Sequence, residues 1–182
     1  MNEKPILFSG PMVRALLAGI KTQTRRLVKY NNMLGEPAEW CSSVAEPGWI
    51  HICGDFRRFC PYGQPGGRLW VRETWRSMGK CNKGTDVVFY RADGHVDGPW
   101  RPSIFMPRWA SRITLEITEV RVQRLQEISE ADARAEGAKH MPDHRWHFRE
   151  IWDSINGKKY PWASNPWVWC LTFKRVDTAP GV

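Results

Sequence analysis

The order of apolar and polar residues divides the chain into several short strands and a few helices. Strict alternation is clearest over residues 112–117, where Ile113, Leu115 and Ile117 face one way. The parity of this pattern changes before Val120, which predicts a bulge or turn directly after residue 117. Four other segments have the composition of strands: residues 5–8, 68–73, 86–91 and 167–173.

The first helix is predicted directly after the first strand. Met12, Leu16 and Leu17 share one helical face. The helix has Pro11 in its first turn and ends at Gly19, which is placed for a left-handed C-terminal cap. The residues that follow, 21–26, then form a loop or the start of a strand.

Two further helices are predicted in the second half of the chain. Ser129 is an N-cap residue with the acidic Asp132 three positions later, which starts a short helix that runs to Gly137. Glu136 therefore lies in the last turn of this helix. A stripe of apolar residues with the spacing i, i+3, i+4, i+7 predicts a third helix over residues 147–156.

These elements favour an α+β fold. Short strands with helices between only some of them indicate a small mixed or antiparallel β-barrel rather than a doubly wound sheet. The 182 residues, 42% of them hydrophobic, fit one domain over residues 1–176, and residues 177–182 are expected to be a flexible tail. Residues 31–67 are rich in Gly, Pro, Asn and Ser without periodicity, which predicts a long loop insertion.

The charge of the chain indicates a polyanionic partner. Lys and Arg number 27 against 19 Asp and Glu, which gives a formal charge of +8. A nucleoside or nucleic acid, RNA rather than DNA, is the expected partner class. Most of the 11 Trp are expected in the core, but some can form a surface on which bases stack. The candidates are Trp70, Trp75, Trp100, Trp109 and Trp146.

The odd number of cysteines, five, has no regular spacing, and no signal peptide or membrane-spanning run is recognisable. A cytoplasmic location without membrane contact is expected. Cys41, His51, Cys53 and Cys60 lie within twenty residues but match no strong zinc signature, so no metal is predicted. His140, His144 and His147 are close in sequence but likewise lack the pattern of a catalytic zinc site.

The segment from residue 19 to residue 26 is the candidate functional centre, expected to face a cleft that holds a nucleotide. Arg25 and Arg26 surround Lys21 with positive charge, and like charges lower the pKa of a lysine. Such a lysine can act as a base toward the hydroxyl of Thr24 or toward water. The alternative from composition alone is a solvated basic loop that contacts phosphate without catalysis.

The pattern Gly19-x-Lys21-x-x-Thr24-x-Arg26 resembles the signature of the ASCH domain family, which belongs to the PUA-like superfamily of small β-barrels. Residues 66–73 look like the glycine turn that leads into a barrel strand of that family, and residues 167–174 look like its closing strand. The length of the chain and its long insertion are similar to the larger ASCH proteins of phages and prophages.

The resemblance implies an activity, because small bacterial members of the family are amidohydrolases that remove the acetyl group from N4-acetylcytidine. Lys21 and Thr24 match two of their catalytic residues, and Glu136 is the candidate for the third, a glutamate on a later short helix. Lys21 then acts as the base, Thr24 or a water as the nucleophile, and Glu136 orients Lys21 or passes a proton to the leaving amine. No cofactor is implied.

Substrate contacts are expected from Arg25, Arg26, Arg72 and Glu73. For Glu73 the alternative is an ion pair with a neighbouring arginine. The chain departs from the small enzymes by its greater length, its large insertion and Gly67, which stands where an acidic residue is common. Other members of the family are linked to RNA binding or RNA cleavage, so a non-catalytic RNA-binding module and a ribonuclease remain alternatives. The oligomeric state stays open.

Overall fold

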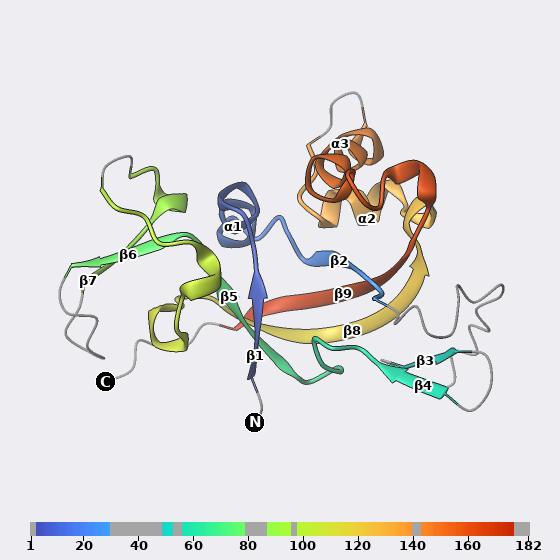
Figure 1. Cartoon of the computed structure of the whole chain (residues 1–182), viewed down its shortest axis with the longest axis horizontal. Coiled ribbons are helices and arrows are strands. Elements are labelled where there is room, and N and C mark those ends of the chain that lie inside the picture. Colours follow the sequence, from blue (N-terminus) through green and yellow to red (C-terminus); the bar gives the residue numbers. More distant parts are fainter. Residues whose placement is uncertain are drawn as a thin grey trace.

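The computed structural model describes residues 3–29, 49–52, 56–78, 87–95, 98–139 and 143–176, with the backbone alone for residues 49–52 and 56–58 (Figure 1). A curved five-stranded sheet forms its centre. The strand order in this sheet is β1-β5-β8-β9-β2. The strands are β1 (Glu3–Leu7), β5 (Arg68–Arg72), β8 (Thr114–Arg124), β9 (Trp167–Val176) and β2 (Gln23–Leu27).

The central sheet is mixed, which agrees with the mixed or antiparallel strand arrangement that was predicted. β1 pairs with β5 in parallel, whereas the other three pairs are antiparallel. The pairing of β8 with β9 shifts register between Ile117 and Glu119, which confirms the irregularity predicted from the change of parity. The edge strands β1 and β2 are linked by a helix, and an Arg26 guanidinium N–H donates to the Leu7 carbonyl at 2.6 Å.

Two β-hairpins extend from the central sheet. β3 (Trp49–Ile52) pairs with β4 (Phe56–Phe59), and β6 (Trp75–Met78) pairs with β7 (Val87–Tyr90). The first hairpin lies within the insertion predicted at residues 31–67, where the sequence lacks the alternation that indicates strands. The second lies at the opposite end of the molecule from α2 and α3 (Figure 1).

The three α-helices are α1 (Gly10–Leu17), α2 (Glu130–Ala135) and α3 (His144–Asn156). Gly19 follows α1 with φ +71°, the left-handed conformation predicted for its cap. The Ser129 hydroxyl accepts from the Asp132 backbone N–H at the start of α2. α3 starts three residues before its predicted beginning because Asp143 caps it through the Trp146 N–H at 2.6 Å.

Short 3-10 helices complete the described elements: η2 (Arg91–Asp93), η3 (Ser103–Phe105), η4 (Arg108–Ala110), η5 (Leu125–Glu127) and η6 (Trp162–Ser164). In the part of the chain that the structure describes, no helix has the length and apolar character needed to cross a membrane.

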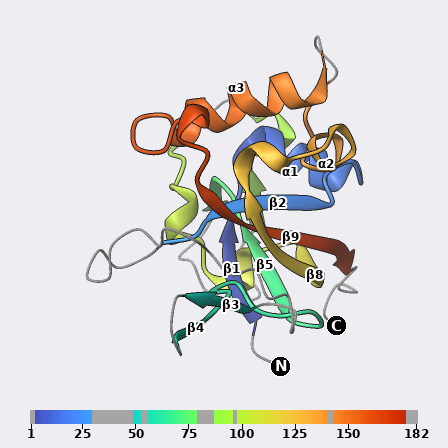
Figure 2. The same ribbon diagram turned by 90° about the vertical axis from the view of Figure 1, so that its right-hand side faces the viewer.

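The two faces of the sheet bury separate hydrophobic clusters. On one face, Phe8 and Leu16 pack with Leu171 and Phe173 beneath β1 and α1. The other face is covered by α2 and α3, and Figure 2 shows α3 lying across it. β2 lies between the two clusters, so alternate residues of this strand reach opposite faces of the sheet. This position allows β2 to present polar side chains to two different buried environments.

Candidate functional site

The segment that contains Lys21 is held between three elements. The backbone N–H groups of residues 20 and 21 donate to the Ala15 carbonyl at the end of α1, at 2.9 and 3.1 Å. The Thr22 N–H donates to the Ala135 carbonyl of α2 at 2.8 Å, and the Thr22 carbonyl accepts from the Phe173 N–H of β9 at 2.9 Å. Helix α1, helix α2 and the sheet therefore meet at Lys21.

Lys21 points at the end of α2. Its ammonium Nζ lies 2.7 Å from Glu136 Oε2 and 2.8 Å from the Glu136 carbonyl oxygen. Both side chains are buried, with 0% of the Lys21 side chain and 5% of the Glu136 side chain exposed. The structure thus brings together the lysine and the glutamate that the sequence separates by 115 positions.

Gly137 makes this close approach possible. Its φ is +86°, and a Cβ added there would lie 3.2 Å from the Ala15 Cβ and 3.6 Å from the Lys21 Cβ. Any other residue would be strained in this backbone conformation and tight against α1. A glycine directly after Glu136 therefore lets the end of α2 pack on Lys21.

Arg25 joins Glu136 to a second carboxylate. Its Nη1 lies 3.2 Å from Glu136 Oε1, and its Nη2 lies 3.0 Å from Asp132 Oδ2. Asp132 Oδ2 also accepts from Arg121 of β8 at 2.9 Å. Because the Arg25 side chain is fully buried, this guanidinium is a fixed bridge between the two carboxylates of α2.

The balance of burial and charge determines the protonation of Lys21. Burial, the largest influence, lowers its pKa from the ordinary value, because the charged ammonium loses its hydration. The Glu136 carboxylate opposes this through its charge and its hydrogen bond, whereas the charges of Arg26 and Arg25 lower the pKa further. Because its pKa is lowered on balance, Lys21 is neutral in a larger fraction of molecules at a given pH than an exposed lysine is.

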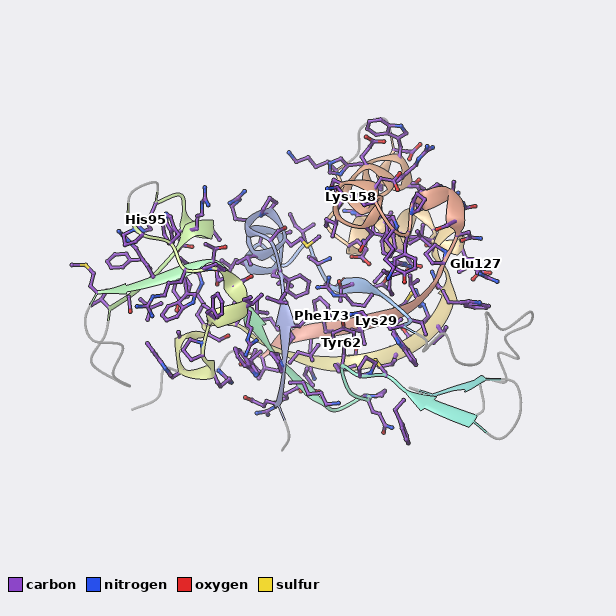
Figure 3. The ribbon with its side chains drawn as sticks, viewed as in Figure 1. Lys29, Tyr62, His95, Glu127, Lys158 and Phe173 are labelled. Carbon is purple, nitrogen blue, oxygen red and sulfur yellow. The ribbon has the colours of Figure 1, made fainter. Side chains whose placement is uncertain are left out.

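Thr24 and Arg26 belong to the opposite face of β2 from Arg25, because residues alternate across a strand. Thr24 is 2% exposed. The Arg26 guanidinium lies 5.1 Å from the centroid of the Phe8 ring, and Lys21 Nζ lies 5.5 Å from the same centroid. Phe8 in turn contacts Phe173, which Figure 3 shows in the middle of the sheet. This ring therefore connects Lys21 with the Thr24 face of the strand.

These positions exclude the solvated-loop alternative for most of the segment. Lys21, Thr24 and Arg25 are exposed by only 2%, 2% and 4%. Charged side chains are buried to this extent only when they are paired. Lys21 is paired with Glu136, and Arg25 is paired with Glu136 and Asp132. Arg26 is half-buried, and its contact with the Leu7 carbonyl involves one of its guanidinium nitrogens.

The other predicted substrate contacts lie in separate surroundings. The Arg72 guanidinium stacks 4.6 Å from the Trp70 ring and donates to the Ile104 carbonyl. Glu73 is 2% exposed and accepts from Arg112 Nε at 3.0 Å and Arg112 Nη2 at 3.1 Å. This is an ion pair with an arginine, the alternative that the sequence offered for Glu73. Burial raises the pKa of Glu73, although the Arg112 guanidinium opposes this.

The structure describes only some of the cysteines and histidines that lie close together in sequence. Cys60 is buried, whereas Cys41, Cys53, His140 and the side chain of His51 lie outside the described residues. The histidines of α3 contact backbone: His144 Nδ1 lies 2.7 Å from the Ala138 carbonyl, and His147 Nδ1 accepts from the Lys139 N–H. No group of three metal-ligating side chains occurs among the residues described.

Sequence reasoning did not single out Asp132, Arg121 or Phe8 as parts of the site. Asp132 was noted only as a residue near the helix start, and its spacing of four from Glu136 is the signal that places both carboxylates on one face of α2. Arg121 lies on β8 and Phe8 follows β1, so nothing in their local sequence ties them to Lys21.

Comparisons with known proteins address the fold. No family model matches the sequence, and no curated protein matches it. The structure is similar to that of an ASCH domain from Lactobacillus crispatus JV V101, with a TM-score of 0.50 and 12% identity over 96% of this chain and 79% of that chain. It is also similar to protein EF3133 from Enterococcus faecalis V583, described as DUF984, with a TM-score of 0.43 and 13% identity. That match covers 90% of this chain and 66% of the other.

The structure is that of a small α+β protein. Within that class it has the fold of an ASCH domain, as the motif of residues 19–26 predicted.

Proposed function

We propose that the protein is an amidohydrolase that removes the acyl group from an N4-acylated cytosine base or nucleoside. The observation that carries this proposal is the buried contact of Lys21 with Glu136 at 2.7 Å, next to two further cations. A lysine whose pKa is lowered in this way is a more effective general base than an ordinary lysine, because more of it is neutral at a given pH.

The reaction follows from these groups. Neutral Lys21 removes the proton of the Thr24 hydroxyl, or of a water in its place, and the oxygen attacks the acyl carbonyl carbon. The carbonyl π electrons move to oxygen, which forms a tetrahedral oxyanion. Its collapse breaks the bond to N4, and the proton held by Lys21 passes to the leaving amine, with Glu136 keeping the lysine in position. When Thr24 is the nucleophile, water then hydrolyses the acyl ester.

The two arginines have different roles in this proposal. Arg25 is occupied by Glu136 and Asp132 and is buried, so it holds the carboxylates in place. Arg26 lies on the same face of β2 as Thr24, and among the residues that the structure describes its side chain donates only to the Leu7 carbonyl, so we assign it to the substrate or the oxyanion.

The formal charge of +8 also favours the second candidate, an RNA-binding module or a ribonuclease. In such a module Lys21 would contact phosphate from the surface. Its full burial against Glu136 supports the hydrolase instead, because a phosphate would have to displace a carboxylate at 2.7 Å.

The proposal is tested by incubating the purified protein with N4-acetylcytidine and measuring cytidine release by chromatography. Lys21→Ala and Thr24→Val are expected to lower the rate by at least about a hundredfold, the range for loss of a general base or nucleophile. Lys174→Ala is the matched control, because the Lys174 side chain is 62% exposed in a surface pair with Glu116.

The control variant is expected to keep the full rate. Absence of cytidine release from the unmodified protein, together with salt-sensitive RNA binding that Lys21→Ala weakens, would refute the hydrolase and support the binding module.

A further inference from the structure

The hairpin of β6 and β7 has two different faces. Residues directly opposite in an antiparallel pair lie on the same face, and the faces alternate along the strands. Trp75 and Tyr90 form one such pair, and with Val88 they pack against Met106 and Trp109 in a small core. The opposite face carries two pairs, Arg76 with Phe89 and Met78 with Val87.

This opposite face, which we call the outer face, carries an ordered stack of rings and a cation. The Arg76 guanidinium lies 4.7 Å from the Phe89 ring and 5.3 Å from the Trp100 ring. The His95 ring meets Phe89 edge-on at 5.7 Å, and Figure 3 shows His95 at the hairpin end of the molecule. A Cβ on Gly98 would overlap the Arg76 guanidinium, so a glycine at φ +110° makes room for it. Arg76 is therefore held in one place before any ligand binds.

The outer face also exposes apolar surface beside this stack. Met78 is 64% exposed and Val87 is 60% exposed, although they form a cross-strand pair. Exposed apolar side chains next to a fixed arginine provide contacts to the flat faces of bases and to sugars, while the guanidinium edge donates to phosphate.

The charge of the region matches an anionic partner. Residues 68–113 contain nine Lys and Arg against four Asp and Glu, so this quarter of the chain carries five of its eight net charges. The two acidic residues of the region that the structure describes, Glu73 and Asp93, both bind Arg112. Within the described ranges no carboxylate therefore pairs with Arg76 or with Arg91 of η2.

We propose that the outer face of the β6–β7 hairpin is a docking surface for single-stranded nucleic acid. Arg76 contacts the phosphate backbone, and Met78, Val87 and His95 contact the sugars and bases. The surface is separate from the Lys21–Glu136 site and binds a strand whether or not that site hydrolyses an amide. A chain with both sites would bind the strand on the hairpin while the Lys21–Glu136 site acts on a base of the same strand.

The test measures binding of two fluorescein-labelled strands of about 12 nucleotides, an oligouridylate and an oligothymidylate, by fluorescence anisotropy over a series of salt concentrations. Met78→Glu/Val87→Glu is expected to weaken binding by about tenfold, because it replaces apolar contacts by repulsion of phosphate. Arg76→Gln is expected to reduce the slope of log K against log salt by about 0.7, the value for one phosphate contact on a single strand. The two strands distinguish RNA from DNA as the ligand.

Ile155→Glu is the matched control, because Ile155 is 57% exposed on α3, away from the hairpin. It is expected to bind as the unmodified protein does, apart from the small effect of one added negative charge. The surface contains none of the residues of the Lys21–Glu136 site, so a lack of N4-acetylcytidine hydrolysis by the unmodified protein would refute the hydrolase and leave this proposal standing. The proposal is overturned if the unmodified protein binds neither strand, or if the control weakens binding as much as the double hairpin variant.

Discussion

Glu136→Gln is expected to destabilise the protein more than Lys21→Met does, although the two residues form one ion pair. The Glu136 carboxylate accepts from Lys21 at 2.7 Å and from Arg25 at 3.2 Å, and both cations have side chains with 0% exposure. Without the negative charge, Lys21 keeps only neutral acceptors, the Glu136 backbone carbonyl at 2.8 Å and the amide oxygen of the new side chain, while Arg25 keeps Asp132. A buried charge is then left without compensation.

The magnitudes follow from this asymmetry. Breaking a buried ion pair by removing one partner costs about 3–5 kcal/mol when a charge remains uncompensated, which is the expectation for Glu136→Gln. In Lys21→Met the carboxylate keeps Arg25, so the expected cost is about 2 kcal/mol, the loss of charge-assisted hydrogen bonds. The double variant should cost less than the sum of the two, because each single variant already removes the same contact.

The assay is urea unfolding at neutral pH followed by circular dichroism, with thermal unfolding as a second measurement. For a domain of this size, about 3–5 kcal/mol corresponds to a fall in Tm of roughly 6–20 °C. An equal cost for both single variants, or a cost for Glu136→Gln within about 1 kcal/mol of zero, would contradict the shared role of the Glu136 carboxylate.

Three further predictions concern neighbouring groups. Gly137→Ala should lower the free energy of unfolding by about 1–2 kcal/mol for its left-handed conformation and by a further amount for its contact with α1. Gly66→Ala, at φ +83° in open space, should show only the cost of the left-handed conformation. Equal losses for both variants in urea unfolding would rule out the contribution of the contact. The rate of any hydrolysis should increase as the pH rises through the Lys21 pKa. Because the Glu136 charge raises that pKa, the increase in the residual activity of Glu136→Gln should occur at lower pH. A move to higher pH would show that Lys21 is not the base. Burial raises the pKa of Cys170 to about 12, so peptide mapping after thiol labelling at pH ~8 should find Cys170 unmodified until urea is added.

Local sequence patterns predicted the elements that depend on a few neighbouring residues. The parity change after Ile117 anticipated the register shift of β8, and Ser129 anticipated the start of α2. The segment at β3 and β4 was not predicted, because a short hairpin whose strands lack alternation carries little local signal. The early start of α3 depends on Asp143, a cap that lies outside the apolar stripe.

The candidate site was predictable in its members but not in its arrangement. Lys21, Thr24 and Arg25 are neighbours in sequence, yet the pleat of β2 turns Thr24 and Arg25 to opposite faces of the sheet. Glu73 has the sequence context of a substrate contact, but Arg112, 39 positions later, binds it.

The sequence by itself determined the location of three helices and of most strands of the central sheet, the positive charge of the chain, and the basic motif that follows α1. Those properties arise from interactions between residues a few positions apart. Only the tertiary structure decided that Lys21 is buried, that Glu136 binds it across 115 positions, and that Arg25 is occupied by the carboxylates of α2. The physical reason is that burial and long-range pairing depend on how α1, α2 and the sheet pack together, and this packing sets the pKa of the lysine.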